Sequence, residues 1–350
     1  MRTSIVEHIR ESLFVTPFDT AWVPYSTRFV LMGGTPRDLG AFSVYKMYEG
    51  KLENLISYEH SKPIKCGTFN ASTNERHIAF ADTGGQLLLV DPECPSKSLF
   101  NVPAHNGIIH AIAGCGPVTA HGASEAVTAG ADGTAKVWDF RQTDGPVVDI
   151  TPNQDSQKRE CWGVSFGGAT SAFDRIMACG YDNGDVKVVD LRMGGILWQT
   201  NVGGGAVNLE FDSLNKEKNK LVVTNLDGFV NVYDLKTHSE EKGFAFVKKK
   251  VHNGTVWRAR HLPSSRDVFA STGGTGEVKL WRYRYPKERT VIDANSKKEE
   301  GVAGKVELIT EQTISSQPVC SFDWHPNKPG LAVCSSFDQS VSVLYVTNLN

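Results

Sequence analysis

The sequence predicts an all-β chain in which one unit of four short strands is repeated seven times. The clearest copy is residues 129–139, where a tight Asp-Gly turn leads into an alternating strand that ends in Trp-Asp. The same pattern closes at Asp91, Asp190 and Asp234, so the copies recur at intervals of about 44 to 51 residues. Trp281 continues the series.

Two weaker copies, at residues 41–45 and 335–344, bring the number to seven. A single unit cannot bury both faces of its sheet, so the copies must pack against one another. A period near 40 to 45 residues is typical of propeller blades, and a closed ring of blades buries every inner face. The sequence therefore predicts one domain over residues 1–350, a seven-bladed β-propeller.

Each predicted blade begins with an inner strand of alternating pattern. The segments 18–22, 162–166 and 320–324 share a period of two and end in an aromatic residue. On this pattern the blades cover about residues 18–57, 63–101, 105–150, 160–200, 205–247, 252–313 and 317–346.

Two segments fall outside the regular repeat. Blade seven lacks an outer strand after residue 346, and residues 3–9 can supply it, which would close the ring and remove two exposed sheet edges. Residues 284–304 interrupt blade six and are polar, charged and poor in apolar side chains. We expect them to form a mobile, solvated insertion between the third and fourth strands of that blade.

Composition argues against several functional classes. The net charge is −2, so the chain has no overall basic field for nucleic acid. Seven cysteines without close pairs indicate reduced thiols. Neither an N-terminal signal region nor an apolar run of membrane-spanning length is evident. We expect a monomeric cytoplasmic protein that binds neither nucleic acid nor membrane.

The repeats resemble those of the WD-repeat β-propeller family over essentially the whole chain. In that family, a His before the inner strand, a Ser or Thr on the second strand, an Asp in the next turn and a Trp on the third strand form a buried network. The resemblance assigns these places in blade three to His105, Thr128, Asp132 and Trp138. Their implied role is structural, because the network satisfies polar groups that are costly to bury.

The other blades match this pattern less well. Blade six has His252, Ser271 and Trp281, but Thr275 stands where the Asp is expected, which predicts an incomplete network. The remaining blades keep the turn residues and lack the His, so the pattern leaves their internal hydrogen bonding open.

The start of the inner strands predicts a partner-binding site at the entrance of the central channel. Lys65, Trp162 and Trp257 occupy this place, and Arg159 and Arg258 lie beside it. Aromatic and arginine side chains around a concavity are typical anchors for a protein or peptide. The alternative is that the Trp side chains only pack between blades.

A second surface motif follows the third strand of blade three. Residues 138–141 read Trp-Asp-Phe-Arg, with a weaker echo that ends at Arg192. The motif resembles the box by which WD-repeat substrate receptors contact the adaptor of cullin-RING ubiquitin ligases. This resemblance makes Arg141 and Arg192 possible ligase-adaptor contacts. Either Arg can equally pair with a nearby carboxylate.

The sequence gives little support for an enzyme. Residues 163–167 match the G-x-S-x-G nucleophile pattern, but they form an inner strand with no helix behind it, so we expect Ser165 to be inert. His105, His110 and His121 have neither a cysteine framework nor a carboxylate at ligand spacing. We predict no catalytic residue, no metal and no cofactor, which disfavours a propeller hydrolase.

Several segments resemble one subgroup of the family, the WD-repeat factors for axonemal dynein assembly. The matching segments, in chain order, are residues 18–24, 62–69, 158–162, 179–185, 255–258, 301–304 and 333–341. The resemblance implies a cytoplasmic co-chaperone adaptor for cilium and flagellum motility. Its implied partners are the RuvB-like ATPase and prefoldin-like complex and dynein heavy chains. The alternative function is a substrate receptor of a cullin-RING ubiquitin ligase.

Overall fold

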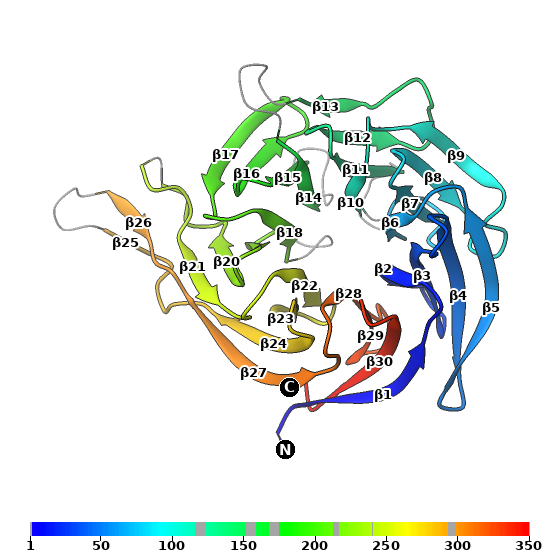
Figure 1. Cartoon of the computed structure of the whole chain (residues 1–350). Helices are drawn as coiled ribbons and strands as arrows, with labels where there is room; N and C mark the ends of the chain where they lie inside the picture. Colours follow the sequence, from blue (N-terminus) through cyan, green and yellow to red (C-terminus); the bar gives the residue numbers. More distant parts are fainter. Residues whose placement is uncertain are drawn as a thin grey trace.

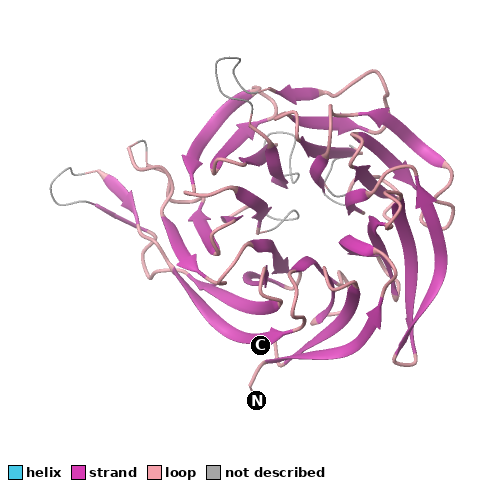
Figure 2. Ribbon diagram, viewed as in Figure 1, coloured by secondary structure: helices cyan, strands magenta, loops and turns pink. Residues whose placement is uncertain are grey.

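The computed structural model describes residues 2–115, 124–151, 159–167, 175–212, 217–239, 241–292 and 298–349. Within these ranges the chain forms strands and turns and no helix, and seven four-stranded antiparallel sheets stand around a central channel (Figure 1, Figure 2). The predicted seven-bladed β-propeller is thus confirmed. No helix of the length and apolarity needed to cross a membrane occurs in the described ranges.

The strands follow one another from the channel to the rim in each blade. Blades one to three comprise β2 (Thr16–Trp22), β3 (Arg28–Gly34), β4 (Gly40–Tyr48), β5 (Lys51–His60); β6 (Ile64–Thr68), β7 (Ile78–Asp82), β8 (Gln86–Val90), β9 (Ser98–Pro103); β10 (Ile109–Gly114), β11 (Glu125–Gly130), β12 (Ala135–Asp139), β13 (Val148–Ile150). Blades four and five comprise β14 (Cys161–Gly167), β15 (Ile176–Tyr181), β16 (Asp185–Asp190), β17 (Gly195–Asn201); β18 (Ala206–Phe211), β19 (Lys220–Asn225), β20 (Phe229–Asp234), β21 (Phe246–Lys250). Blades six and seven comprise β22 (Val256–Leu262), β23 (Ser265–Gly273), β24 (Glu277–Arg284), β27 (Lys305–Thr313); β28 (Val319–Trp324), β29 (Leu331–Ser336), β30 (Ser340–Thr347), β1 (Ser4–Ser12).

The outer strand of blade seven comes from the start of the chain. Strand β1 pairs antiparallel with β30, from Ser4 opposite Thr347 to Ser12 opposite Ser340. Ile5 and Ile9 of β1 are buried, so this strand contributes to the core as well as to the sheet. The two ends of the chain lie close together in Figure 1. The pairing covers the edge of β30 that would otherwise be exposed.

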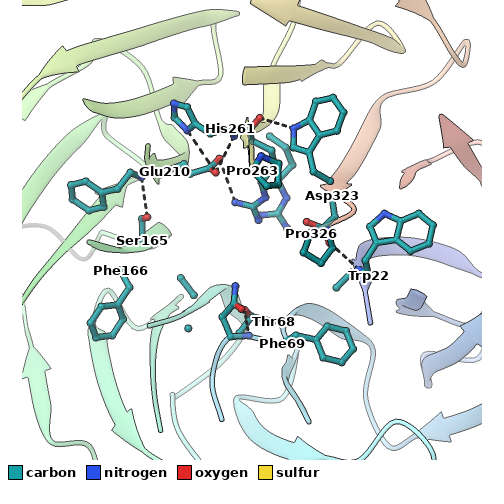
Figure 3. Close-up of a pocket in the computed structure, with 18 of the residues that line it drawn as sticks. Trp22, Thr68, Phe69, Ser165, Phe166, Glu210, His261, Pro263, Asp323 and Pro326 are labelled. Atoms are coloured by element: carbon teal, nitrogen blue, oxygen red, sulfur yellow. Dashed lines mark hydrogen bonds and ion pairs between the residues drawn. The ribbon is translucent and has the colours of Figure 1, made fainter. Parts of the chain in front are cut away.

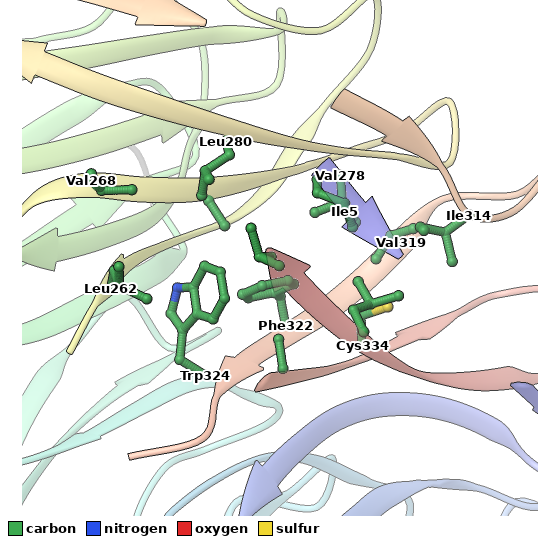
Figure 4. Close-up of a cluster of buried hydrophobic side chains, with 14 residues drawn as sticks. Ile5, Leu262, Val268, Val278, Leu280, Ile314, Val319, Phe322, Trp324 and Cys334 are labelled. Carbon is green, nitrogen blue, oxygen red and sulfur yellow. The ribbon is translucent and has the colours of Figure 1, made fainter. Parts of the chain in front are cut away.

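The hydrophobic core lies between neighbouring blades. Figure 4 shows one such layer, in which Leu262 and Leu280 of blade six face Phe322 and Trp324 of blade seven. The rings of Phe322 and Trp324 meet edge to face at 4.9 Å. Strand residues are buried on both faces because each sheet is covered by a blade on either side. This packing fixes the inner strands around the channel.

Inner strands are also joined to the next blade by side chains that accept backbone N–H groups. An inner strand is the edge of its own sheet, so these N–H groups have no partner within the blade. The acceptors and donors are Asp19 Oδ2 and Gly67 (3.1 Å), Ser165 Oγ and Phe211 (3.3 Å), Asn208 Oδ1 and Ala259 (2.9 Å), Glu210 Oε1 and His261 (3.1 Å), and Asp323 Oδ2 and Trp22 (2.9 Å).

The insertion in blade six is partly regular. Strands β25 (Thr290–Ile292) and β26 (Glu299–Gly301) form a hairpin that projects from the rim, and residues 293–297 lie outside the described residues. The Arg289 guanidinium donates to the buried Asp234 carboxylate of blade five, with Nε 2.9 Å from Oδ2. Arg289 also lies over the Tyr285 ring at 4.7 Å. Polar composition did not indicate the bond to Asp234, because that partner comes from another blade.

Candidate functional site at the channel entrance

Every inner strand carries one extra residue at the same place. The pairing register with the second strand shifts by one residue near its start, which leaves seven residues unpaired: Phe18, Lys65, His110, Trp162, Val207, Trp257 and Cys320. A β-bulge turns the side chain of its extra residue away from the regular alternation. Because the inner strands run in the same direction around the channel, these residues encircle one end of it. We call this set the bulge ring.

The bulge ring contains the three channel residues predicted from the sequence, Lys65, Trp162 and Trp257. All three are half-buried, which fits side chains at an opening. The sequence analysis did not identify Phe18 and His110 as members. Their position in the sequence would have indicated them, because each bulge residue follows the first or second residue of its inner strand.

One side of the bulge ring is an aromatic cluster. The Trp257 ring meets Phe337 edge to face at 5.5 Å, and Phe18 meets Phe337 at 6.5 Å. The Lys65 ammonium lies 4.9 Å from the centre of the Phe18 ring, and burial lowers the pKa of Lys65. The Trp257 Nε1 donor is buried and has no hydrogen-bond partner among the described residues. The cluster therefore combines apolar area with a cation beside an aromatic ring, features that are common in protein-binding surfaces.

The opposite side of the bulge ring is held by Glu160. Its Oε2 atom accepts from Trp162 Nε1 at 3.0 Å and lies 3.1 Å from His110 Nε2. Burial lowers the pKa of His110, although Glu160 partly opposes the effect. Arg159 precedes Glu160 and is half-buried. These contacts orient the Trp162 ring at the channel entrance.

Arg258 lies deeper than the bulge ring and is already bonded. Its guanidinium is 3.2 Å from Asp19 Oδ2, and its side chain is 15% exposed. Asp19 belongs to blade one and Arg258 to blade six, so the ion pair reaches past blade seven. The charge of Arg258, one of the predicted partner-binding residues, is therefore neutralised inside the molecule.

The structure brings His105, Thr128, Asp132 and Trp138 into one hydrogen-bonded network. His105 Nδ1 lies 3.0 Å from Asp132 Oδ1, and His105 Nε2 lies 2.7 Å from Thr128 Oγ1, which accepts from Trp138 Nε1 at 2.9 Å. Burial lowers the pKa of His105, so its ring stays neutral and accepts from the Thr128 hydroxyl. Burial also raises the pKa of Asp132, but hydrogen bonds from Asn106, His105 and Thr134 lower it more, to about 2.

The expectation of an incomplete network in blade six is wrong. His252 Nε2 lies 2.7 Å from Ser271 Oγ, which accepts from Trp281 Nε1 at 2.8 Å. The place of the missing aspartate is taken by Glu277, whose Oε2 is 3.2 Å from His252 Nδ1. The longer Glu side chain reaches the ring from a later position than Thr275.

The expectation that the remaining blades lack the His is also wrong for blade two. His60 Nε2 lies 2.9 Å from the buried Asp82 carboxylate. In blade seven the same place is held by Ser315, which donates to Asp338 at 2.7 Å. Spacing in the sequence would have indicated these places. Each of the four residues lies four positions before the first residue of an inner strand: His60, His105, His252 and Ser315.

The two arginines of the possible ligase box lie at the surface. Arg141 donates to its own Asp139, with Nη2 2.6 Å from Oδ2, and its side chain is 62% exposed. Arg192 lies 3.6 Å from Asp190 Oδ1. Phe140 packs edge to face on Phe100 of blade two. Each arginine thus pairs with the aspartate two residues before it.

The sequence analysis considered several residues as a nucleophile, metal ligands or reduced thiols. Ser165 is buried on β14, where its hydroxyl accepts the Phe211 N–H. Among the described residues, no group of three His, Cys, Asp or Glu side chains could hold a metal ion. His121 lies outside the described residues. All seven cysteines are free thiols, and all except Cys94 are buried.

Comparison with known proteins agrees with this architecture. Residues 96–139 and 308–343 match the model of the WD domain, G-beta repeat. Each match begins near the outer strand of one blade and ends on the third strand of the next. The seven-bladed ring, with its His, hydroxyl and Trp networks, defines a WD-repeat β-propeller.

The relatives are more specific. The chain is 46% identical over 351 residues to dynein axonemal assembly factor 10 of Homo sapiens. The alignment covers 100% of this chain and 98% of the relative. It is 42% identical over 352 residues to the protein of that name from Chlamydomonas reinhardtii, with the same coverage. The Dictyostelium discoideum protein of that name is 22% identical over 369 residues, with 96% and 94% coverage. The chain belongs to the dynein axonemal assembly factor 10 family.

Proposed function

We propose that this protein is a non-enzymatic scaffold that acts in the cytoplasmic assembly of axonemal dyneins. The observation that carries the proposal is the sequence identity of 42% to 46%, over the full chain, with proteins named for dynein axonemal assembly. A rigid propeller supports it, because a closed ring of sheets holds several binding surfaces at fixed separations. The structural use of Ser165 is consistent with a role that does not require catalysis.

The finer proposal is a co-chaperone adaptor. It would hold the RuvB-like ATPase and prefoldin-like complex and present dynein heavy chains, the partners that the family resemblance implies. The bulge ring is the proposed contact surface, through Lys65, Trp162 and Trp257, with Arg159 beside them. Half-buried Trp side chains supply large contact areas at low entropic cost, which is why they recur at the centres of protein interfaces.

The test is affinity purification of the intact protein from ciliated cells beside an Arg159→Glu/Trp257→Ala double variant. The intact protein should recover RuvB-like ATPases and dynein heavy chains, and the double variant should lose them. The matched control is Arg284→Glu/Tyr345→Ala, which changes the same kinds of residues on the rim, where both are exposed. Equal thermal unfolding of all three proteins establishes that lost binding is not lost folding.

The ligase alternative is tested in the same experiment with Arg141→Glu and Arg192→Glu. A ligase receptor would recover a cullin-RING adaptor and lose it in these variants. The assembly scaffold would keep its chaperone partners in both. Recovery of the adaptor without chaperones or dynein heavy chains would overturn the proposed function.

A further inference from the structure

A cavity lies in the channel at the end opposite the bulge ring. The cavity measures about 750 Å³ and is lined by the far halves of the inner strands. In Figure 3, His261, Glu210 and Asp323 lie along one side, and Phe166 and Phe69 lie on the other. This volume is in the range of pockets that bury a ligand group. The contacts at the bulge ring do not account for this cavity.

Three acidic and two basic side chains meet at the centre of the cavity wall. Arg258 pairs with Asp19 at 3.2 Å, and Arg260 Nη1 lies 3.7 Å from Glu210 Oε2. Asp323 has no ion-pair partner within the described ranges, and its Oδ2 atom accepts the Trp22 N–H. The carboxylates at the centre of the wall therefore outnumber the guanidinium groups by one, and His261 Nδ1 lies 3.7 Å from Glu210 Oε1 beside them.

The other charges at the cavity do not make up the difference. Asp212 is paired with Lys220 at 3.3 Å and with Arg266 at 2.8 Å. Lys220 is fully buried and also binds Asp267 at 2.9 Å. These groups satisfy one another at the side of the cavity formed by blades five and six.

The pKa of Asp323 is consistent with this shortage of positive charge. Burial raises the pKa of Asp323 to about 7; the Trp22 N–H and Arg260 oppose this rise, and the Asp19 and Glu210 carboxylates add to it. Burial lowers the pKa of Arg260, but Glu210, Asp323 and Asp19 raise it by more. A bound cation would replace the proton on Asp323.

Further buried polar groups beside the cavity lack hydrogen-bond partners, although Glu210 lies 3.7 Å from both Arg260 and His261. His261 is 8% exposed, and neither ring nitrogen has a hydrogen-bond partner among the described residues. The same holds for Glu210 Oε2 and for Trp22 Nε1. Unpaired buried polar groups are costly, and a polar ligand that lets Glu210 and His261 re-pair would relieve part of that cost.

Aromatic side chains complete the wall. Trp22, Phe69, Phe166, Phe211 and Trp324 all line the cavity, and Trp324 is fixed by donation from its Nε1 to the Arg260 carbonyl at 3.0 Å. These five side chains are 1% to 6% exposed, so they form a fixed apolar wall around the charged groups. We propose that this cavity binds one basic side chain, an arginine or lysine of a polypeptide partner, at the Asp323 carboxylate. This inference does not depend on the proposed function.

The experiment uses the full chain with selective 15N labelling of tryptophan. Three blocked pentapeptides, identical except for a central arginine, lysine or citrulline, are titrated while the indole N–H signals of Trp22 and Trp324 are followed. The arginine and lysine peptides should shift these signals, and the citrulline peptide, which is uncharged, should not. A single side chain should bind at about millimolar Kd.

Two further measurements tie the binding to Asp323. Asp323→Asn keeps an acceptor for the Trp22 N–H and should weaken binding about tenfold or more, whereas Asp149→Asn on the surface should not. In the unmodified protein, binding should tighten about tenfold from about pH 6 to about pH 8, as Asp323 loses its proton. The groups that face Asp323 are Asp19, Glu210, Arg258, Arg260 and His261.

Clear outcomes would overturn the proposal. Equal binding of the citrulline and arginine peptides would exclude a cation site, because citrulline carries no charge. Absence of any indole shift at tens of millimolar peptide, or an unchanged affinity in both Asp323→Asn and the pH series, would do the same. Because the pH series needs no variant, the test stands even if Asp323→Asn does not fold.

Discussion

Asp19 Oδ2 in blade one lies 3.2 Å from an Arg258 guanidinium nitrogen in blade six. The Asp19 side chain is 7% exposed and that of Arg258 is 15% exposed, so both charges are largely removed from water. Blade seven, which is completed by the two ends of the chain, stands between their blades. The pair therefore links the two blades that flank the closing blade.

A double-mutant cycle should measure this link. Asp19→Asn and Arg258→Met, alone and together, should show a coupling of about 1 to 3 kcal/mol in the free energy of unfolding. The double variant should lose less stability than the sum of the two single losses, because each single variant leaves one buried charge without its partner. Urea unfolding measures all four proteins. Strict additivity would mean that the pair adds nothing to stability.

The hydroxyl at the centre of the blade-three network should be important for stability. Thr128→Val keeps the shape and leaves His105 Nε2 and Trp138 Nε1 without their partner. We expect a loss of about 2 to 4 kcal/mol, from two buried groups left unsatisfied. Ser271→Ala should have a similar effect in blade six. Thr313→Val, on the exposed rim, is the control for the loss of a hydroxyl.

Stability should depend on pH through Asp323. Its pKa is about 7 in the folded protein and about 4 in an unfolded chain, so the folded state holds a proton that the unfolded state releases between these values. The stability of the wild type should therefore fall relative to Asp323→Asn as pH rises from about 5 to 7, by up to about 1.4 kcal/mol per unit. Above pH 7 the difference should level off. A difference that is independent of pH would show that Asp323 is ionised throughout.

The hairpin of β25 and β26 should depend on Arg289. Arg289→Ala removes the guanidinium that binds Asp234, and a hydrogen bond to a charged group contributes about 1.5 to 3 kcal/mol. Hydrogen exchange in Thr290–Ile292 and Glu299–Gly301 should become about tenfold faster or more. Arg284→Ala, which removes an exposed pair with Glu307, should leave this exchange unchanged. Equal effects of the two variants would contradict the assignment.

The repeat made the fold predictable, because turn and strand chemistry recurs in every blade. The same repetition located Lys65, Trp162 and Trp257 at equivalent places. Phe18 and His110 were missed because a bulge shifts the register by one residue, and periodicity does not reveal which residue is left unpaired. Their place just after the start of each inner strand would have identified them.

Contacts between blades were less predictable. Glu277 replaces an aspartate by reaching from a different position, and Arg289 finds its partner in another blade. The balance of charges around Asp323 depends on side chains from blades one, five, six and seven. Local patterns carry no information about such pairs, because the residues are brought together only when the ring is complete.

The pairing of β1 with β30 has a consequence for the order of folding. During synthesis β1 is made before every other strand of the ring and β30 after every other one, so the first strand must wait for its partner until the rest of the propeller has been translated. Contacts between residues this distant in sequence form slowly. A nascent chain of this protein thus carries β1 without its sheet partner until β30 has been made.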